Sequence, residues 1–226
     1  MFKLAMFDMD GVLLDSMPRH AACWSIRFRE DYGFEIPVSE VYANEGRSSR
    51  DFIASIIRKY FNREAPQEEV DAMYRRKCAT VDSRGGMPPM PGALEAVKAV
   101  RAQGMEAVVV TGSGHTKLLN FIKEAYPGLF HTDWMVCAND GIRCKPNPDP
   151  YLAGLRNAGG IDPSEAIVIE NAPLGVQAGK AAGCYVIAVN TGPLPDAALF
   201  EAGADVVLHS MFELAEMICT LRESLA

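Results

Sequence analysis

Residues 4–12 read LAMFDMDGV, in which four apolar residues are followed at once by Asp8, Met9, Asp10 and Gly11. A short apolar run of this kind, bounded by polar residues and glycine, is typical of a buried parallel strand. Side chains just beyond such a strand project into the crevice outside the sheet. A carboxylate there can attack phosphorus, and a second acid can protonate the leaving oxygen and then activate water. The same residues are also compatible with an ordinary Asp-rich turn at the end of a strand.

Further strands of this type alternate with helical stretches along the chain. The predicted strands are residues 4–7, 107–110, 134–138, 167–169, 185–189 and 205–208. The predicted helices of the same part are residues 92–103, 115–126, 150–157, 174–182, 196–201 and 211–221. Strand–helix–strand repeats at this spacing predict an α/β fold with a doubly wound, parallel, Rossmann-like sheet, in which ligands bind at the carboxyl ends of the strands.

The interval between the first and second predicted strands has no strand pattern. Apolar residues recur there at helical spacing in three stripes, which start at Met17, Phe52 and Val70. Glycine and proline cluster at both ends of the interval, as is typical of hinges. We therefore predict that residues 16–89 form an all-helical cap domain inserted into a catalytic core of residues 1–15 and 90–226.

Composition and charge limit the classes of partner. The 226 residues have a formal net charge of −7, which disfavours a nucleic-acid partner because phosphate backbones need a Lys/Arg surface. No apolar run approaches the ~20 residues that cross a bilayer, and Asp8 and Asp10 interrupt any secretory signal. The six cysteines are scattered without a CxxC pair, as expected of reduced thiols. We expect a cytoplasmic protein with no membrane or nucleic-acid partner, present as a monomer or weak homodimer.

Two further stretches offer groups that bind anions. The second strand runs into VTGSG, where Thr111, Gly112 and Ser113 provide hydroxyl and backbone N–H groups before a helix, a typical anion site. The run KPNPDP presents Lys145 from a loop that its prolines make rigid. Taken singly, the first stretch is also compatible with a helix cap and the second with a surface lysine.

A last stretch supplies oxygen ligands. IVIEN places Glu170 and Asn171 at the end of another predicted strand. Oxygen atoms at the tips of adjacent strands suit Mg²⁺, which prefers a few carboxylates together with water and phosphate. We therefore expect Mg²⁺ as the cofactor.

In this order, the four stretches resemble the haloacid dehalogenase (HAD) superfamily. DMDGVLLDS, VVVTG, KPNPDPY and VIENAPLGVQAG are similar to its four motifs. The resemblance covers essentially the whole chain, including a helical cap in the first insertion position. It is closest to the branch that contains β-phosphoglucomutase and small sugar phosphatases.

The resemblance implies a role for each matching residue. Asp8 would be the nucleophile that forms an aspartyl-phosphate, and Asp10 the general acid and base. Thr111 and the N–H groups around Gly112 would hold the transferring phosphoryl group. Lys145 would offset the charge between the nucleophile and the phosphate. These roles agree with the view that positioning and electrostatics supply most of phosphoryl-transfer catalysis.

The implied metal site departs from the family pattern at one position. Asp8, the carbonyl of Asp10, Glu170 and Asn171 would hold Mg²⁺. The fourth motif usually ends in two acids, whereas here the second is Asn171. A carboxamide oxygen can still ligate the metal, but the site loses one negative charge.

Residues of the predicted cap should determine which substrate binds. His20 lies where the β-phosphoglucomutase pattern has a histidine on the first cap helix, although a half-exposed helical histidine would look the same. Arg47 and Arg50 could clamp a distal phosphate, or Arg50 could simply flank the start of the next helix. Glu45 is unusual on a substrate loop, because an acid repels a bare phosphate.

Several activities fit the motifs. A dehalogenase has no use for the acid Asp10, because a halide leaves without a proton, so phosphate chemistry is favoured. A non-catalytic interaction module would require loss of the nucleophile, acid or lysine, and none is lost. We favour a hydrolase over a mutase, since a phosphatase needs only water where a mutase must hold a bisphosphorylated intermediate.

Glu45 and Asn171 together suggest a substrate. If Glu45 reaches Mg²⁺ when the cap closes, it restores the charge that Asn171 lacks and leaves little room for a bulky sugar. The pair also resembles that of a HAD branch that hydrolyses inorganic pyrophosphate. We therefore predict a pyrophosphatase, with a sugar-phosphate phosphatase or β-phosphoglucomutase as the alternative.

Overall fold

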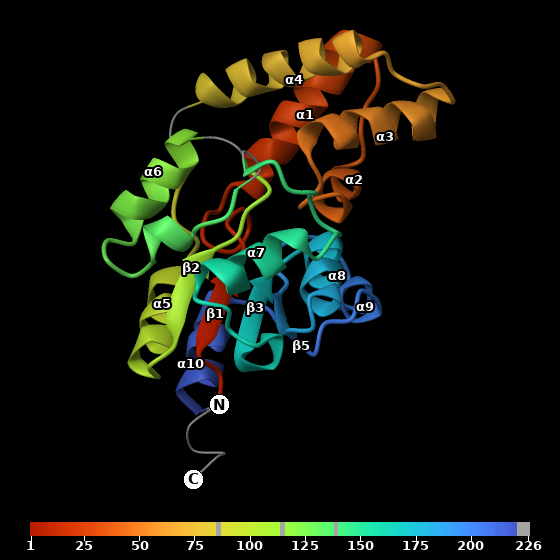
Figure 1. Cartoon of the computed structure of the whole chain (residues 1–226). Helices are drawn as coiled ribbons and strands as arrows, with labels where there is room; N and C mark the ends of the chain where they lie inside the picture. Colours follow the sequence, from red (N-terminus) through yellow and green to blue (C-terminus); the bar gives the residue numbers. More distant parts are fainter. Residues whose placement is uncertain (85–86, 114–115, 138–139, 221–226) are drawn as a thin grey trace.

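The computed structural model describes residues 1–84, 87–113, 116–137 and 140–220. Its strands form one five-stranded sheet in the order β2-β1-β3-β4-β5 (Figure 1). The strands are β1 Leu4–Phe7, β2 Glu106–Val109, β3 Ala166–Glu170, β4 Tyr185–Val189 and β5 Val206–Leu208. Every pairing between neighbouring strands is parallel, and β1 lies between β2 and β3. The predicted fold class is confirmed.

Helices cover both faces of this sheet (Figure 1). They are α5 Ala93–Ala102, α6 Thr116–Ala125, α7 Asp149–Asn157, α8 Pro173–Ala181, α9 Asp196–Glu201 and α10 Met211–Thr220. Successive strand residues point to opposite faces. Phe7 and Val109 therefore pack with α5 and α10, whereas Met6 and Val108 pack with α7 and α8. The strands are buried on both sides, which explains their continuous apolar runs.

A separate group of helices lies above the carboxyl ends of the strands (Figure 1). We call it the helical module: α1 Met17–Tyr32, α2 Val38–Ala43, α3 Ser49–Phe61 and α4 Gln67–Asp82. Its core combines aliphatic side chains with aromatic rings, and the ring centres of Trp24 and Phe52 are only 4.9 Å apart. All four helices fall within the predicted cap, whose bounds stay a prediction. Residues 85 and 86 of the second predicted hinge lie outside the described residues.

The two segments that join the module to the sheet run side by side. Leu14 forms an antiparallel bridge with Pro89. The Asp15 N–H donates to the Pro88 carbonyl at 3.0 Å, and the Met90 N–H donates to the carbonyl of residue 13 at 2.9 Å. The module is therefore attached through a paired connection, which restrains how it can move over the site.

One predicted strand differs from the structure. Residues 132–134 form a 3-10 turn, η1 Thr132–Trp134, in which the Trp134 ring stacks on His131 at 3.9 Å. Only Val136 pairs with the sheet, through a single bridge to Val110, and residue 138 lies outside the described part. This apolar run looks like a strand in the sequence. In the structure, most of its residues pack beside β2, at the edge of the sheet, without pairing with it.

Among the described residues, two short elements match none of the predicted ones. They are α2 and a second 3-10 turn, η3 Pro163–Glu165, and both are too short to show a periodic pattern. Within the described residues, no helix combines the length and the apolar character needed to cross a membrane.

Candidate active site

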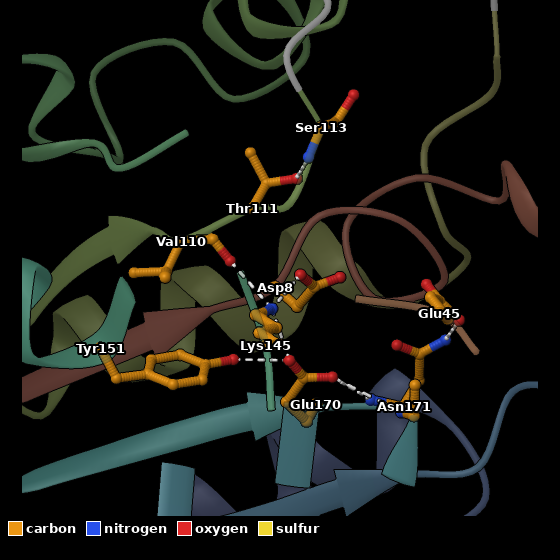
Figure 2. Close-up of polar contacts among 10 residues, drawn as sticks. Asp8, Glu45, Val110, Thr111, Ser113, Lys145, Tyr151, Glu170 and Asn171 are labelled. Carbon is orange, nitrogen blue, oxygen red and sulfur yellow. Dashed lines mark hydrogen bonds and ion pairs between the residues drawn. The ribbon is translucent and has the colours of Figure 1, made fainter. Parts of the chain in front are cut away.

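Side chains from three adjacent strands meet at the carboxyl edge of the sheet (Figure 2). Asp8 directly follows β1, Thr111 lies two residues beyond β2, and Glu170 ends β3. All three are buried. They come together because parallel neighbours end at the same edge.

Lys145 links these residues. Its side chain is buried, and Nζ donates to Asp8 Oδ1 at 2.5 Å, to Glu170 Oε1 at 2.6 Å and to the Val110 carbonyl at 3.2 Å. A lysine ammonium has three hydrogens, so these three acceptors match its full donor capacity. The lysine that was predicted from its proline-rich loop therefore lies against the predicted nucleophile.

Glu170 has protein donors on both carboxylate oxygens. Besides Lys145, Oε1 accepts a 2.6 Å hydrogen bond from the Tyr151 hydroxyl. The other oxygen accepts from the backbone N–H groups of Asn171 at 3.1 Å and Ala172 at 3.4 Å. Both oxygens of Glu170 therefore have protein partners in the described structure, and its role as a metal ligand stays a prediction.

The loop after β2 lines a cavity. The Thr111 hydroxyl accepts a 2.9 Å hydrogen bond from the Ser113 N–H. A β-carbon at Gly112 would lie 3.1 Å from the carbonyl oxygen of Gly46, so the helical module closely approaches this loop. The three predicted residues of the loop, Thr111, Gly112 and Ser113, all face the same cavity.

This cavity encloses about 100 Å³ between the sheet edge and the helical module. The core contributes Asp8, Asp10 and the loop after β2. The module contributes polar side chains of both signs, among them His20, Glu45, Arg47 and Lys77. Both halves of the molecule are therefore needed to form it.

A chain of polar contacts joins the module to Asp10. Lys77 Nζ donates to His20 Nδ1 at 3.1 Å, and because an ammonium can only donate, the ring proton of a neutral His20 is on Nε2. Burial and the charge of Lys77 keep the pKa of His20 below its ordinary value, which favours that neutral ring. His20 Nε2 lies 3.3 Å from Asp10 Oδ1, which also accepts from the Ser16 hydroxyl at 2.6 Å.

In the sequence, Lys77 is only one of several further cationic candidates for the substrate site, each of which would ordinarily be a solvated surface charge. The side chain is buried, and its ammonium lies 5.2 Å from the centre of the Trp24 ring. A signal was present, because Lys77 lies four residues from both Met73 and Val81 and so belongs to their buried stripe. A lysine in such a stripe needs a partner, and here the partner is His20.

The two predicted arginines have different positions. Arg47 lines the cavity, and its buried Nε has no hydrogen-bond partner within the described residues. Arg50 instead donates to Asp71 Oδ1 at 2.5 Å and lies over the Tyr74 ring at 4.3 Å. The prediction for Arg50 is not supported, because the first turn of α3 directs this side chain to α4 on the module surface.

Glu45 and Asn171 meet across the boundary between module and core. Asn171 Nδ2 donates to Glu45 Oε2 at 2.8 Å. The two remaining oxygens, Glu45 Oε1 and Asn171 Oδ1, are buried and have no hydrogen-bond partner in the described part of the chain. Two free buried oxygens from opposite sides are a donor arrangement suited to a cation.

The charge balance also favours a cation. Burial raises the pKa of Asp8 to about 8, and the negative charges of Glu170 and Asp10 add to this effect against Lys145. Burial, together with Asp8 and Asp10, raises the pKa of Glu45 well above its ordinary value. The described residues contain no group of three His, Cys, Asp or Glu side chains placed to hold a metal. A divalent ion would therefore need the amide oxygen of Asn171 and main-chain oxygens as well.

Comparisons place the chain among known proteins. A family model described as haloacid dehalogenase-like hydrolase matches residues 2–183. Hexitol phosphatase A of Escherichia coli is 31% identical and covers 92% of this chain and 91% of its own. Glycerol-1-phosphate phosphohydrolase 2 of Saccharomyces cerevisiae is 32% identical and covers 91% of this chain and 81% of its own. A solved structure from Bacteroides vulgatus, provisionally assigned as a beta-phosphoglucomutase, is 43% identical and has a TM-score of 0.91. The match covers 99% of this chain and 90% of that chain.

Proposed function

The chain belongs to the family of haloacid dehalogenase-like hydrolases, and from this premise we propose that it is a phosphohydrolase whose nucleophile is Asp8. The observation that carries the proposal is the contact of 2.5 Å between Asp8 and the buried ammonium of Lys145 at the edge of a small cavity. A nucleophilic carboxylate must stay ionised to react, and an adjacent fixed cation favours the ionised form.

The proposed reaction has two displacements. An oxygen of Asp8 attacks phosphorus, the bond from phosphorus to the leaving oxygen breaks, and Asp10 gives that oxygen a proton. Asp10 then takes a proton from water, the water oxygen attacks the same phosphorus, and the bond to Asp8 breaks to release phosphate. His20 and Ser16 orient Asp10 through their contacts with its Oδ1.

The side chains present fit a divalent cation such as Mg²⁺. Asp8, the carbonyl of Asp10, Glu170 and Asn171 would hold it, with Glu45 reaching it from the module. The free buried oxygens of Asn171 and Glu45 support this assignment. Bound there, the ion would neutralise charge on the phosphoryl oxygens, which favours attack by an anionic nucleophile.

We further propose inorganic pyrophosphate as the favoured substrate. The cavity of about 100 Å³ is far smaller than the roughly 300–1,000 Å³ typical of pockets for drug-sized ligands. Arg47 and Lys77 would face the distal phosphate, and Arg47 Nε is free to donate. The Glu45 carboxylate repels a bare phosphate, but it would be compatible with a phosphate that carries a divalent ion.

A polyol or sugar phosphate is the second candidate. The observation in its favour is that two relatives are described as a hexitol phosphatase and a glycerol-1-phosphate phosphohydrolase. A mutase acting on a hexose phosphate is compatible with the Bacteroides vulgatus structure. A hexitol or hexose phosphate is larger than pyrophosphate and would extend beyond the present cavity of about 100 Å³.

The deciding experiment compares kcat/KM for pyrophosphate, glycerol phosphate, hexitol and hexose phosphates, and β-glucose 1-phosphate with its bisphosphate activator. Pyrophosphate should have the highest value. Glu45→Ala should weaken both Mg²⁺ dependence and pyrophosphate turnover, whereas Glu64→Ala, on the exposed surface of the module, should change neither. A hexose phosphate as the best substrate, together with a silent Glu45→Ala, would exclude the pyrophosphatase.

A further inference from the structure

The loop that follows β4 meets the helical module away from the cavity. We call residues 190–195, which lie between β4 and α9, the β4 ledge. Among the described residues, those that line the cavity include none from the ledge. The ledge nevertheless contacts the module at two points, Gly192 and Leu194. The proposed reaction gives these contacts no role.

The first contact is between Gly192 and Tyr42 of α2. Tyr42 is buried, and a β-carbon at Gly192 would lie 2.7 Å from Cδ1 of its ring. This separation is too short for a side chain at residue 192, so the glycine allows the ring to approach the backbone closely. The module therefore rests directly on the main chain of the ledge at this point.

The second contact brings a side chain of the ledge into the packing of the module. Leu194 is half-buried and packs against an apolar cluster whose other described members all lie between residues 17 and 74. Four members of this cluster also line the cavity, namely Met17, Trp24, Val41 and Phe52. Leu194 therefore packs against the same cluster that forms the apolar wall of the cavity.

The ledge is itself fixed to the core. Asn190 Nδ2 donates to the Leu194 carbonyl at 2.8 Å, and a proline on each side of Leu194 restricts the loop further. The Thr191 hydroxyl donates to the Gly11 carbonyl at 2.6 Å. Gly11 directly follows Asp10, the proposed general acid. The ledge is therefore tied to the loop that carries the reacting carboxylates.

Tyr42 connects the ledge to the cavity. The Glu45 N–H donates to the Tyr42 carbonyl at 3.3 Å, and Glu45 Oε2 accepts from Asn171 Nδ2 at 2.8 Å. Because Glu45 lies within one turn of Tyr42, a shift of Tyr42 on the ledge would move Glu45 with it. The depth at which the module sits on the ledge therefore controls how far Glu45 reaches toward the core.

We propose that the β4 ledge is a specificity-determining element, which holds the module at the depth that gives a cavity of about 100 Å³ and so favours pyrophosphate over larger phosphate esters. This inference rests on the proposed function, because it takes pyrophosphate as the substrate. Gly192 and Leu194 are positioning residues, since they act through Tyr42 and the apolar wall of the cavity.

The first test is Leu194→Ala, with kcat/KM measured for pyrophosphate and for sorbitol 6-phosphate. A displacement of reacting groups by about 1 Å can cost up to ~10²-fold in rate, so weaker seating should lower the value for pyrophosphate about tenfold. The value for sorbitol 6-phosphate should stay the same or rise, because this ester extends beyond the cavity of the seated module. The ratio of the two values should therefore fall about tenfold or more.

The matched control is Leu129→Ala. Leu129 is also half-buried, but it packs against the apolar cluster of the sheet. This variant should lower Tm and leave the ratio of the two kcat/KM values unchanged, since a loss of folded enzyme affects both substrates equally.

The second test is amide hydrogen exchange without substrate. In Leu194→Ala, residues 41–45 should exchange faster than in the wild type, because α2 loses part of its support. Residues 185–189 of β4 should exchange at the wild-type rate, since the sheet is unchanged. This pattern separates loss of seating from general unfolding.

Three outcomes would overturn the inference. They are an unchanged ratio in Leu194→Ala, unchanged exchange of residues 41–45, and an equal fall of the ratio in Leu129→Ala. Failure of the proposed function is recognised without these variants, by a wild type that prefers sorbitol 6-phosphate to pyrophosphate or by turnover that survives Asp8→Asn.

Discussion

The sheet edge and the helical module treat their buried polar groups differently. At the sheet edge, Lys145 and Glu170 have a protein partner for every donor and acceptor position. On the module, the atoms Arg47 Nε and Glu45 Oε1 are also buried but have no partner within the described residues. The pair of Lys145 and Glu170 in the core is thus organised before any ligand binds, whereas the module, together with Asn171 Oδ1 of the core, still offers free groups. We infer that the core performs the chemistry and that ligand binding completes the module.

The packing of the two regions also differs. The sheet packs mainly aliphatic side chains on both faces, which leaves the strand ends little freedom. The module buries aromatic rings together with aliphatic side chains. Several of its ion pairs lie on the surface, as in Arg58 with Glu64, whose side chains are 63% and 73% exposed, and exposed pairs contribute little to stability. The module is therefore held together by its buried apolar side chains and by its contacts with the sheet.

The largest effect on activity should come from a substitution at the sheet edge. Asp8→Asn should abolish turnover, because an amide cannot form the phosphoryl-enzyme. The fold should persist, since the change adds no volume and removes one negative charge from a site with an excess of them. Turnover and Tm measured on the same preparation test this. More than a trace of activity in a clean sample would exclude covalent catalysis by Asp8.

A smaller effect should come from the free groups of the module. Arg47→Gln should lower kcat/KM for pyrophosphate about 10- to 100-fold, because hydrogen bonds to charged groups contribute roughly 1.5–3 kcal/mol. Arg50→Gln is the matched control and should remain near the wild type, since Arg50 pairs with Asp71. Equal losses in both variants would mean that the two arginines act only through general charge.

The contact between the two halves can be tested at Gly192. A β-carbon there would lie 2.7 Å from the Tyr42 ring of the module. Overpacking of this kind costs roughly 1–3 kcal/mol, so Gly192→Ala should lower kcat/KM about tenfold by preventing the module from seating. Adding Tyr42→Leu should restore part of the loss. If the second change makes activity worse, the two residues do not meet during turnover.

The smallest effect should come from the surface of the module. Arg58→Ala removes a partner of Glu64, both of them solvent-exposed. Kinetics should be unchanged, and Tm should shift by no more than about 2 °C. A clear loss of activity would show that the outer surface of the module takes part in closure.

Sequence alone determined the fold class and the residues of the sheet edge. Apolar runs followed by polar residues predict strands and what lies at their ends, and parallel strands bring those ends together. Asp8, Thr111 and Glu170 could therefore be assigned to one edge before any coordinates. The module was predictable as helices because its apolar stripes have helical spacing. Short elements such as α2 lacked such a pattern.

Tertiary structure alone decided the partners of these side chains. Lys77 meets His20 across 57 positions of sequence, and Asn171 meets Glu45 across 126. Arg47 and Arg50 look alike in the sequence, yet one faces the cavity and the other faces Asp71. Local patterns report the period of a helix or strand, but a side chain's partner depends on how distant elements pack. For that reason Tyr151 and the saturated carboxylate of Glu170 emerged only from the folded chain.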